Sequence, residues 1–155
     1  MSEPVPKPET VAVVDIGASA VRLVVAEIRP GERPFLIEEA SRGVLLGKDT
    51  FSTGRIGATS MEAALKALEG FRRLMDGYGV SRYRAVATSA VREAANSDTF
   101  LDRVQLRTGL LVEIIDGSEE SRLTYLAVRD RLKGHPALGA PHTLLVEVGG
   151  GSADL

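Results

Sequence analysis

The sequence predicts an α/β fold in which a mixed sheet is flanked by helices. Two β-branched runs, 11–15 and 21–28, are separated by a small-residue turn and indicate a hairpin. A third apolar run follows at 35–47, and after it helical and strand patterns alternate to the end of the chain. Three meandering strands followed by alternating helices and strands are typical of a mixed sheet with helices on its faces.

The elements after the third strand are predicted from periodicity and capping signals. Apolar residues recur at spacings of three and four over 59–79, which predicts a helix with Thr59 or Ser60 as its N-cap and Gly77 as its stop. The polar segment 47–57 before this helix is expected to be a loop. Strands are expected at 83–89 and 110–116, and a last strand together with its glycine loop at 143–152. Helices are expected at 99–109, capped by Ser97 and Asp98, and from 117 onward.

Composition excludes several classes of function. The chain has 155 residues, of which 44% are hydrophobic and 26% charged, and its net charge is −2 with the two signs interleaved. No global field attracts nucleic acid or an anionic membrane, and no apolar run is long enough to span a bilayer. The absence of cysteine removes disulfides, thiolate metal sites and a cysteine nucleophile. The expected location is the cytoplasm, since the start of the sequence lacks the apolar stretch of a signal peptide.

Two segments repeat the same arrangement of residues, namely "VVDIGASA" near the start and "LLVEVGGGSADL" at the end. In each, an apolar strand is followed by a carboxylate (Asp15 or Glu147), one spacer, glycine and small residues. Glycine lets the backbone approach a ligand closely, and successive amides can converge on phosphate oxygens. A neighbouring carboxylate is suited to hold Mg²⁺ or to orient an attacking water. A single segment of this kind usually forms a turn that binds no ligand. The presence of two such segments predicts an anion site in which the two loops face each other.

Two further strand-to-helix junctions carry polar residues, and each has two interpretations. Arg92 follows Thr88 and Ser89 closely, so these residues either touch a phosphate or form an ordinary N-cap with a surface arginine. Glu119 and Glu120 lie in a first helical turn, where the macrodipole favours negative charge. A carboxylate there also suits a general base. Because successive helical residues diverge by about 100°, the two glutamates cannot share one role.

Four segments in this order resemble the N-terminal part of the exopolyphosphatase / guanosine pentaphosphate phosphohydrolase family: "VAVVDIGASAVRLVVAEI", "AVATSAVREAANSDTFLDRV", "VEIIDGSEESRLTYLAV" and "LLVEVGGGSADL". The resemblance covers nearly the whole chain from residue 11. It implies the ribonuclease-H-like fold of the actin, sugar-kinase and heat-shock-chaperone superfamily. It also implies release of terminal phosphate from polyphosphate or guanosine pentaphosphate, with Mg²⁺ and a carboxylate that activates water.

The resemblance also implies roles for individual residues. Glu120 takes the position of the catalytic base, and Arg92 would bind phosphate. Asp15 and Glu147 would hold the metal, and the phosphate-binding loops would comprise Gly17, Ser19, Gly149, Gly150, Gly151 and Ser152. The expected ligands are polyphosphate or guanosine penta- or tetraphosphate. The protein is also expected to form a homodimer.

The first loop departs from the family pattern Asp-x-Gly-Ser-Asn-Ser, because it reads "DIGASA" and so has Ala18 and Ala20 in place of hydroxyls. Each lost donor to a charged phosphate is worth about 1.5–3 kcal/mol. In the second loop Glu147 stands for the usual Asp and Ala153 for Thr, and a misplaced metal or water costs roughly a hundredfold in rate. These departures favour anion binding over efficient hydrolysis.

The resemblance divides the chain into a flexible tail (1–9), an N-terminal lobe (10–138), and a linker with the first strand and phosphate loop of a second lobe (139–155). In the superfamily the ligand lies between the lobes, so the 155-residue chain by itself is expected to turn over little substrate. One alternative is a degenerate regulatory module that binds polyphosphate or an alarmone without cleaving it. Another is an ATP-dependent kinase or chaperone-type domain of the same superfamily.

Overall fold

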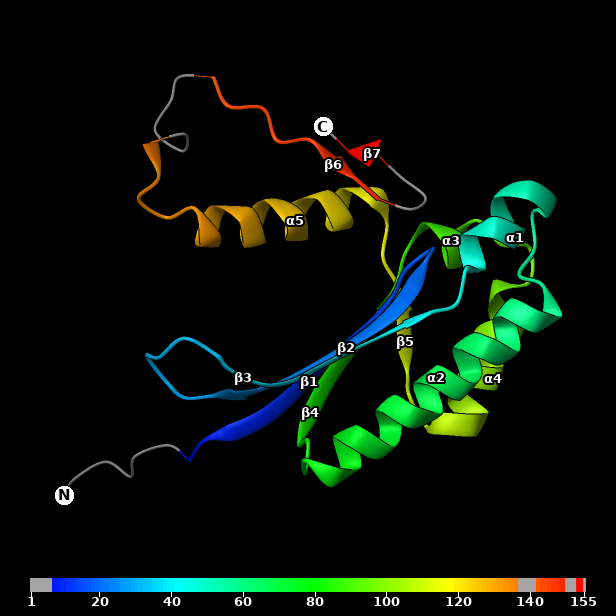
Figure 1. The fold of residues 1–155 in the computed structure, drawn as a ribbon, viewed down its shortest axis with the longest axis horizontal. Helices are drawn as coiled ribbons and strands as arrows, with labels where there is room; N and C mark the ends of the chain where they lie inside the picture. Colours follow the sequence, from blue (N-terminus) through cyan, green and yellow to red (C-terminus); the bar gives the residue numbers. More distant parts are fainter. Residues whose placement is uncertain (1–6, 137–141, 150–152, 155) are drawn as a thin grey trace.

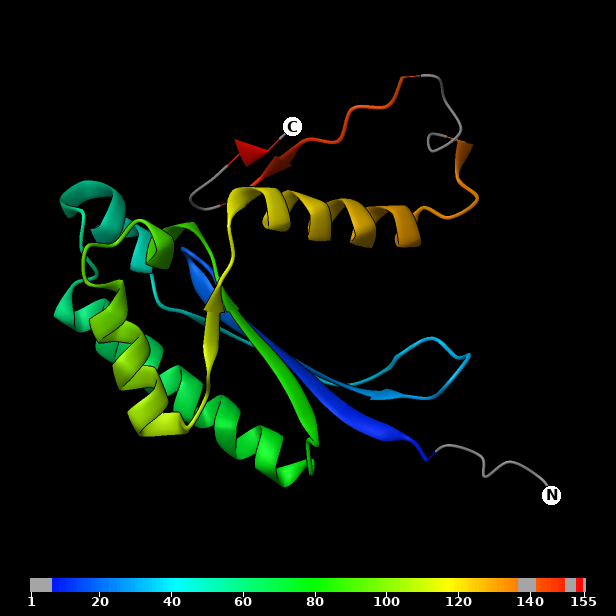
Figure 2. The same ribbon diagram turned by 180° about the vertical axis from the view of Figure 1, so that it is seen from behind.

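A computed structural model describes residues 7–136, 142–149 and 153–154, and Figures 1 and 2 show it from opposite sides. A five-stranded sheet in the order β3-β2-β1-β4-β5 forms its centre. The first two strand pairs in the chain are antiparallel, whereas β1–β4 and β4–β5 are parallel, so the predicted mixed sheet is confirmed. The strands are β1 (Glu9–Ile16), β2 (Ala20–Ile28), β3 (Phe35–Gly43), β4 (Arg82–Ala87) and β5 (Val112–Ile114).

The helices lie on both sides of this sheet. In both views α2 and α4 cover one side, and α5 lies on the other beside a separate two-stranded sheet. No helix in the described part of the chain is long and apolar enough to cross a membrane. The helices are α1 (Leu46–Thr53), α2 (Ala58–Gly77), α3 (Ser89–Arg92), α4 (Ser97–Thr108) and α5 (Gly117–Arg131), and the small sheet consists of β6 (Glu147–Val148) and β7 (Ala153–Asp154).

The core lies between the sheet and helices α2 and α4. Strand periodicity turns alternate side chains of β1 and β2 inward, including Val14 and Leu23, while Val13 is exposed on the other face. The predicted stripe of α2 is buried at Met61, Leu65, Leu68, Phe71 and Met75, but Leu74 stays partly exposed. The apolar patterns of these strands and of this helix therefore predicted the core correctly at most positions.

The predicted loop at 47–57 was wrong, because helix α1 occupies most of it. The third strand ends at Gly43 rather than near Gly47, and Leu45 then takes a left-handed backbone conformation with φ 53°. The chain here is held by the first loop: the amides of Val44 and Leu45 donate to the Ser19 carbonyl at 3.0 and 3.2 Å. This turn is set by a tertiary contact, which local composition does not reveal.

Two predicted helix caps were also wrong. Helix α2 starts after Gly57, and the expected cap Ser60 instead donates its hydroxyl hydrogen bond to the Asp49 carboxylate. Helix α4 starts after Asn96, whose side chain bridges the backbone of Ile56. In both cases the side chain at the start of the helix bonds a residue that is distant in sequence. It does not cap an amide of the first helical turn.

Several segment boundaries also differ from the predictions. β1 starts at Glu9, inside the predicted tail, while residues 1–6 lie outside the described residues. β5 is limited to three residues, and the predicted strand at 143–152 is reduced to β6. Residues 150–152 of that predicted segment lie outside the described residues.

Replacing Asn96 with alanine should destabilise the chain by about 1–3 kcal/mol, because the Ile56 backbone is then left without its partner. Asn96 accepts from the Ile56 amide at 2.8 Å and donates to the Ile56 carbonyl at 3.0 Å, and Ile56 is buried. Urea unfolding measures the change. Asp98→Ala, at an exposed position in the same first helical turn, is the control. Equal stability of Asn96→Ala and this control would contradict the assignment.

Candidate functional site

A cleft of about 290 Å³ lies where β1 and β4 end and α5 begins. The first loop, the β4–α3 junction, the start of α5 and the β6 segment all contribute to it, so residues distant in sequence meet here. Described residues of both glycine-bearing segments, including Gly17 and Gly149, line this one cleft. The residues lining it are Asp15, Gly17, Ala18, Ser19, Arg22, Thr88, Ser89, Glu120, Glu147, Val148 and Gly149.

Sheet topology explains why these residues meet. β1 and β4 are parallel neighbours, with Asp15 opposite Val86 and Ile16 opposite Ala87, so both strands end at the same edge. The Thr88 amide donates to the Ile16 carbonyl at 3.2 Å and extends this pairing into the loop. The carboxyl ends of parallel strands are where open α/β sheets bind ligands.

The first loop is a tight turn. The Gly17 amide donates to the Ala20 carbonyl at 3.0 Å, and a Cβ at Gly17 would lie only 3.2 Å from that oxygen. Ala18 is buried under the loop, whereas Ser19 is exposed. The methyl group that replaces the family hydroxyl at position 18 is therefore packed, and Ser19 is the hydroxyl that this loop presents to solvent.

The two predicted metal ligands, Asp15 and Glu147, line the same cleft, and each already has a partner. Arg22 donates to Asp15 Oδ2 at 3.1 Å, and the Thr124 hydroxyl donates to Glu147 Oε2 at 2.6 Å. Within the described residues, no group of three or more acidic or histidine side chains could hold a metal. Mg²⁺ commonly binds one or two carboxylates and completes its shell with water and substrate phosphate. The two carboxylates fit that kind of site.

Glu120, the predicted catalytic base, also lines the cleft. Its Oε2 lies 3.6 Å from Arg92 Nη1, which donates to the Ile115 carbonyl at 2.8 Å. Arg92 is not among the described residues that line the cleft, and its guanidinium also binds a backbone carbonyl. A phosphate-binding role for Arg92 stays a prediction.

The adjacent Glu119 is turned away from the cleft. Arg122 donates to both of its oxygens, at 2.6 and 2.9 Å, and Arg84 lies 3.7 Å from Oε1. Hydrogen bonds from Arg122 hold the pKa of Glu119 below its ordinary value, with a smaller contribution from Arg84. Asp116 caps the same helix by accepting from the Glu119 amide at 2.8 Å. The two glutamates thus have different partners, as expected from the divergence of successive helical residues.

Sequence reasoning named Thr88 and Ser89 only as possible cap or phosphate residues, and it missed Arg22. Both hydroxyl residues are buried and line the cleft. Arg22 stands opposite Asp15 in the β1–β2 register, so the hairpin pattern could have identified it. The predicted residues Gly150, Gly151 and Ser152 lie outside the described residues.

Replacing Gly47 with alanine should loosen the first loop and destabilise the chain by about 1–3 kcal/mol through overpacking. A Cβ at this position would lie 2.8 Å from that of Ala18 and 2.7 Å from the Phe51 ring, and the Gly47 amide holds the Ala18 carbonyl. Thermal unfolding measures the loss. Gly77→Ala is the control, because a Cβ there meets no atom within 4 Å. A Gly47→Ala chain as stable as this control would contradict the packing described.

The family model of the Ppx/GppA phosphatase family matches residues 24–155. "Exopolyphosphatase 1" of Mycobacterium leprae is 34% identical over 143 residues, which cover 92% of this chain and 41% of that protein. "Exopolyphosphatase 2" of Mycobacterium tuberculosis is 31% identical over 153 residues, covering 94% and 47%. The chain spans less than half the length of these curated relatives.

Solved structures agree with the sequence matches. A crystal structure of the Aquifex aeolicus member of the Ppx/GppA family superposes with a TM-score of 0.76 at 39% identity, covering 82% of this chain and 41% of that one. An exopolyphosphatase from Cytophaga hutchinsonii gives 0.75 at 31% identity, with 79% and 39% covered. The chain shares the fold of these Ppx/GppA family structures, with the predicted mixed sheet flanked by helices. On its fold, its cleft and these matches, the chain belongs to the Ppx/GppA phosphatase family.

Proposed function

We propose that the protein carrying this chain releases terminal phosphate from inorganic polyphosphate or guanosine pentaphosphate. The observation that supports this most is the meeting of three carboxylates, Asp15, Glu120 and Glu147, with two glycine-bearing loops in one cleft. Carboxylates alone would repel a phosphate chain, whereas loop amides and hydroxyls beside them can hold it. The cleft thus combines groups for binding an oligoanion with a group for activating water.

In the proposed reaction Glu120 accepts a proton from a water molecule whose oxygen attacks the terminal phosphorus. The bridging P–O bond breaks, and its electron pair stays on the oxygen of the shortened chain. Ser19 and Ser89, which line the cleft, would donate to oxygens of the terminal phosphate, and Arg92, 3.6 Å from Glu120, would hold its side chain in place. Asp15 and Glu147 would hold Mg²⁺, which neutralises phosphate charge when bound.

The 155-residue chain by itself is expected to release little phosphate. Efficient phosphoryl transfer needs a site closed against bulk water, with donors on several sides of the transferred group. The described residues line this cleft from β1, the first loop, β2, the β4–α3 junction, the start of α5 and the β6 segment. The expected homodimer and the cytoplasmic location stay predictions.

Phosphate release by the intact protein tests the proposal, with polyphosphate and guanosine pentaphosphate supplied in separate assays with Mg²⁺. Release from either substrate, one terminal phosphate at a time, is the expected result. A preference between the two assays assigns the substrate. Absence of release from both would overturn the proposed hydrolysis.

The second candidate is a regulatory module that binds polyphosphate or an alarmone without cleaving it. Ala18 and Ala20, which replace two hydroxyls in the first loop, favour this function. Calorimetric titration of the intact protein, followed by analysis of the recovered ligand, separates the candidates. Tight binding with the ligand recovered unchanged is the result expected of the module.

A further inference from the structure

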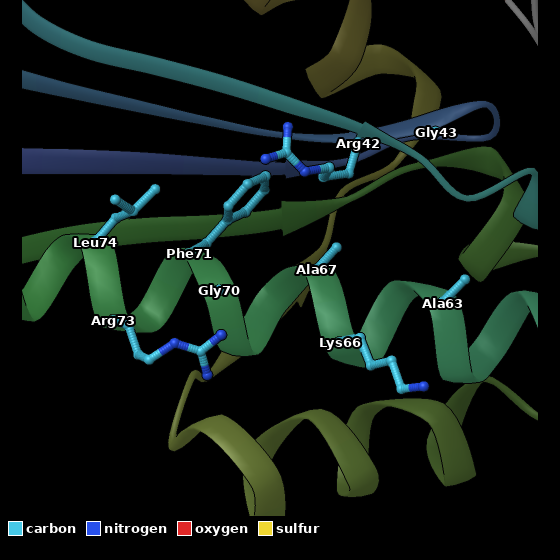
Figure 3. Close-up of a pocket in the computed structure, with 9 residues that line it drawn as sticks. All are labelled: Arg42, Gly43, Ala63, Lys66, Ala67, Gly70, Phe71, Arg73 and Leu74. Atoms are coloured by element: carbon cyan, nitrogen blue, oxygen red, sulfur yellow. The ribbon is translucent and has the colours of Figure 1, made fainter.

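A groove of about 640 Å³ lies along α2 beside the edge strand β3, and it shares no lining residue with the cleft (Figure 3). β3 contributes Arg42 and Gly43, and α2 contributes small residues such as Ala67 and Gly70. Figure 3 shows Lys66 and Arg73 extending from the same side of α2, with Arg42 reaching from β3 toward Phe71. The groove therefore has cationic groups from two elements around a floor of small side chains.

The charge of this groove is uniformly positive. Its described lining includes three cations and no carboxylate. The nearest acids along α2, Glu62 and Glu69, both accept from Arg107 of α4 at 2.7 Å. Lys66 and Arg73 form no ion pair with any residue in the described part of the chain. In a chain of net charge −2, this surface is suited to attract an anion.

Helix geometry sets the length of a matching anion. Lys66 and Arg73 are seven residues apart, which places them about 10.5 Å apart along the helix axis. A linear anion with several charges can contact both groups along the helix, whereas one orthophosphate can do so only if both side chains converge on it. The missing side chain at Gly70, over which the Arg73 guanidinium lies, lets such a ligand approach the helix closely.

The groove adjoins the first loop of the cleft. A Cβ at Gly43 would lie 4.0 Å from the Ser19 carbonyl oxygen, and the next two amides donate to that oxygen. Ser19 is exposed and lines the cleft. An extended ligand in the groove can thus lie next to the loop that is proposed to hold the terminal phosphate.

We propose that the α2–β3 groove is a second binding site for a linear oligophosphate of three or more phosphates. The ligand class rests on the proposed function, but binding here does not require hydrolysis. Lys66 and Arg73 contact one flank of the ligand and Arg42 the other. The oligophosphate is either a free inorganic chain or the phosphate tail of a nucleotide.

Titration of the 155-residue chain with tripolyphosphate at low ionic strength tests this, by calorimetry and by NMR of the backbone amides. Amide shifts are expected at Gly43 and Gly70, which flank the groove. The double variant Lys66→Gln/Arg73→Gln should weaken binding about tenfold, with the difference shrinking as salt is added. Orthophosphate should cause no comparable shifts.

The matched control is Lys48→Gln/Arg72→Gln, which removes the same charge. Arg72 is the neighbour of Arg73 on α2 but bonds Asp76 at 2.6 Å, and Lys48 lies on α1. Unchanged affinity in this control is expected. Equal weakening in both double variants, or no shift at Gly43 and Gly70, would overturn the proposal.

Parallel titrations with a nucleoside triphosphate separate the two ligand sources. Tighter binding of the inorganic chain assigns the groove to free polyphosphate, and tighter binding of the nucleotide assigns it to a nucleotide tail. Because no assay here measures phosphate release, loss of the groove site would leave the proposed hydrolysis standing. Failure of hydrolysis in the intact protein would equally leave the groove result intact.

Discussion

Replacing Glu120 with glutamine in the intact protein should reduce phosphate release by about 10²–10⁴-fold, the range typical of losing a general base. The amide keeps the size of the side chain but cannot take a proton from water. Oligophosphate affinity should change little, because Glu120 is not one of the groups expected to bind phosphate. Rates measured at saturating polyphosphate, together with calorimetric affinity, separate these effects.

Glu119→Gln is the matched control for this experiment. Glu119 has the same chemistry and the adjacent position, but Arg122 holds it away from the cleft. This variant should keep most of the activity. Full activity in Glu120→Gln, or an equal loss in both variants, would contradict the assignment of the base.

Replacing Phe100 with alanine should destabilise the chain by about 3–5 kcal/mol, the largest stability effect expected from a single change described for this chain. Phe100 is fully buried at the start of α4, in the core between α2 and the sheet. Alanine leaves a cavity that the packed neighbours cannot fill without moving. The midpoint of urea unfolding, with its slope, measures the change.

Leu106→Ala provides the comparison for Phe100, because Leu106 lies on the same helix but is 85% exposed. Its loss removes little buried surface, so a change within about 0.5 kcal/mol is expected. A Phe100→Ala chain that unfolds at the same urea concentration as Leu106→Ala would show that α4 does not share the core as described.

The cleft contains residues whose meeting the sequence predicted and contacts that the sequence did not predict. The repeated pattern of strand, carboxylate and glycine predicted that Asp15 and Glu147 would meet, although 132 positions separate them (147 minus 15). They do line one cleft. What the pattern could not supply were the partners of these groups, since Arg22 reaches Asp15 across a hairpin and Thr124 reaches Glu147 from another helix.

The incorrect predictions have a common cause. Helix α1 and the starts of α2 and α4 depend on contacts with Ala18, Ser19, Asp49 and Ile56, which lie elsewhere in the chain. Local signals for a loop or a cap are weak, about 1 kcal/mol each, so one long-range hydrogen bond can override them. The apolar stripe of α2 combines the burial of many side chains, so no single long-range contact overrides it, and it predicted the helix correctly.

The sequence by itself determined the two apolar strand runs of β1 and β2, the buried stripe of α2 and the pair of glycine loops. These features are local patterns of residue type and spacing, so they can be recognised without knowing any neighbour. Only the tertiary structure decided that Glu120 lines the cleft while Glu119 binds Arg122, and that Arg92 contacts both Glu120 and the Ile115 carbonyl. The direction of each of these side chains is set by partners from other elements, and hydrogen bonds between distant residues leave no periodic trace in the sequence.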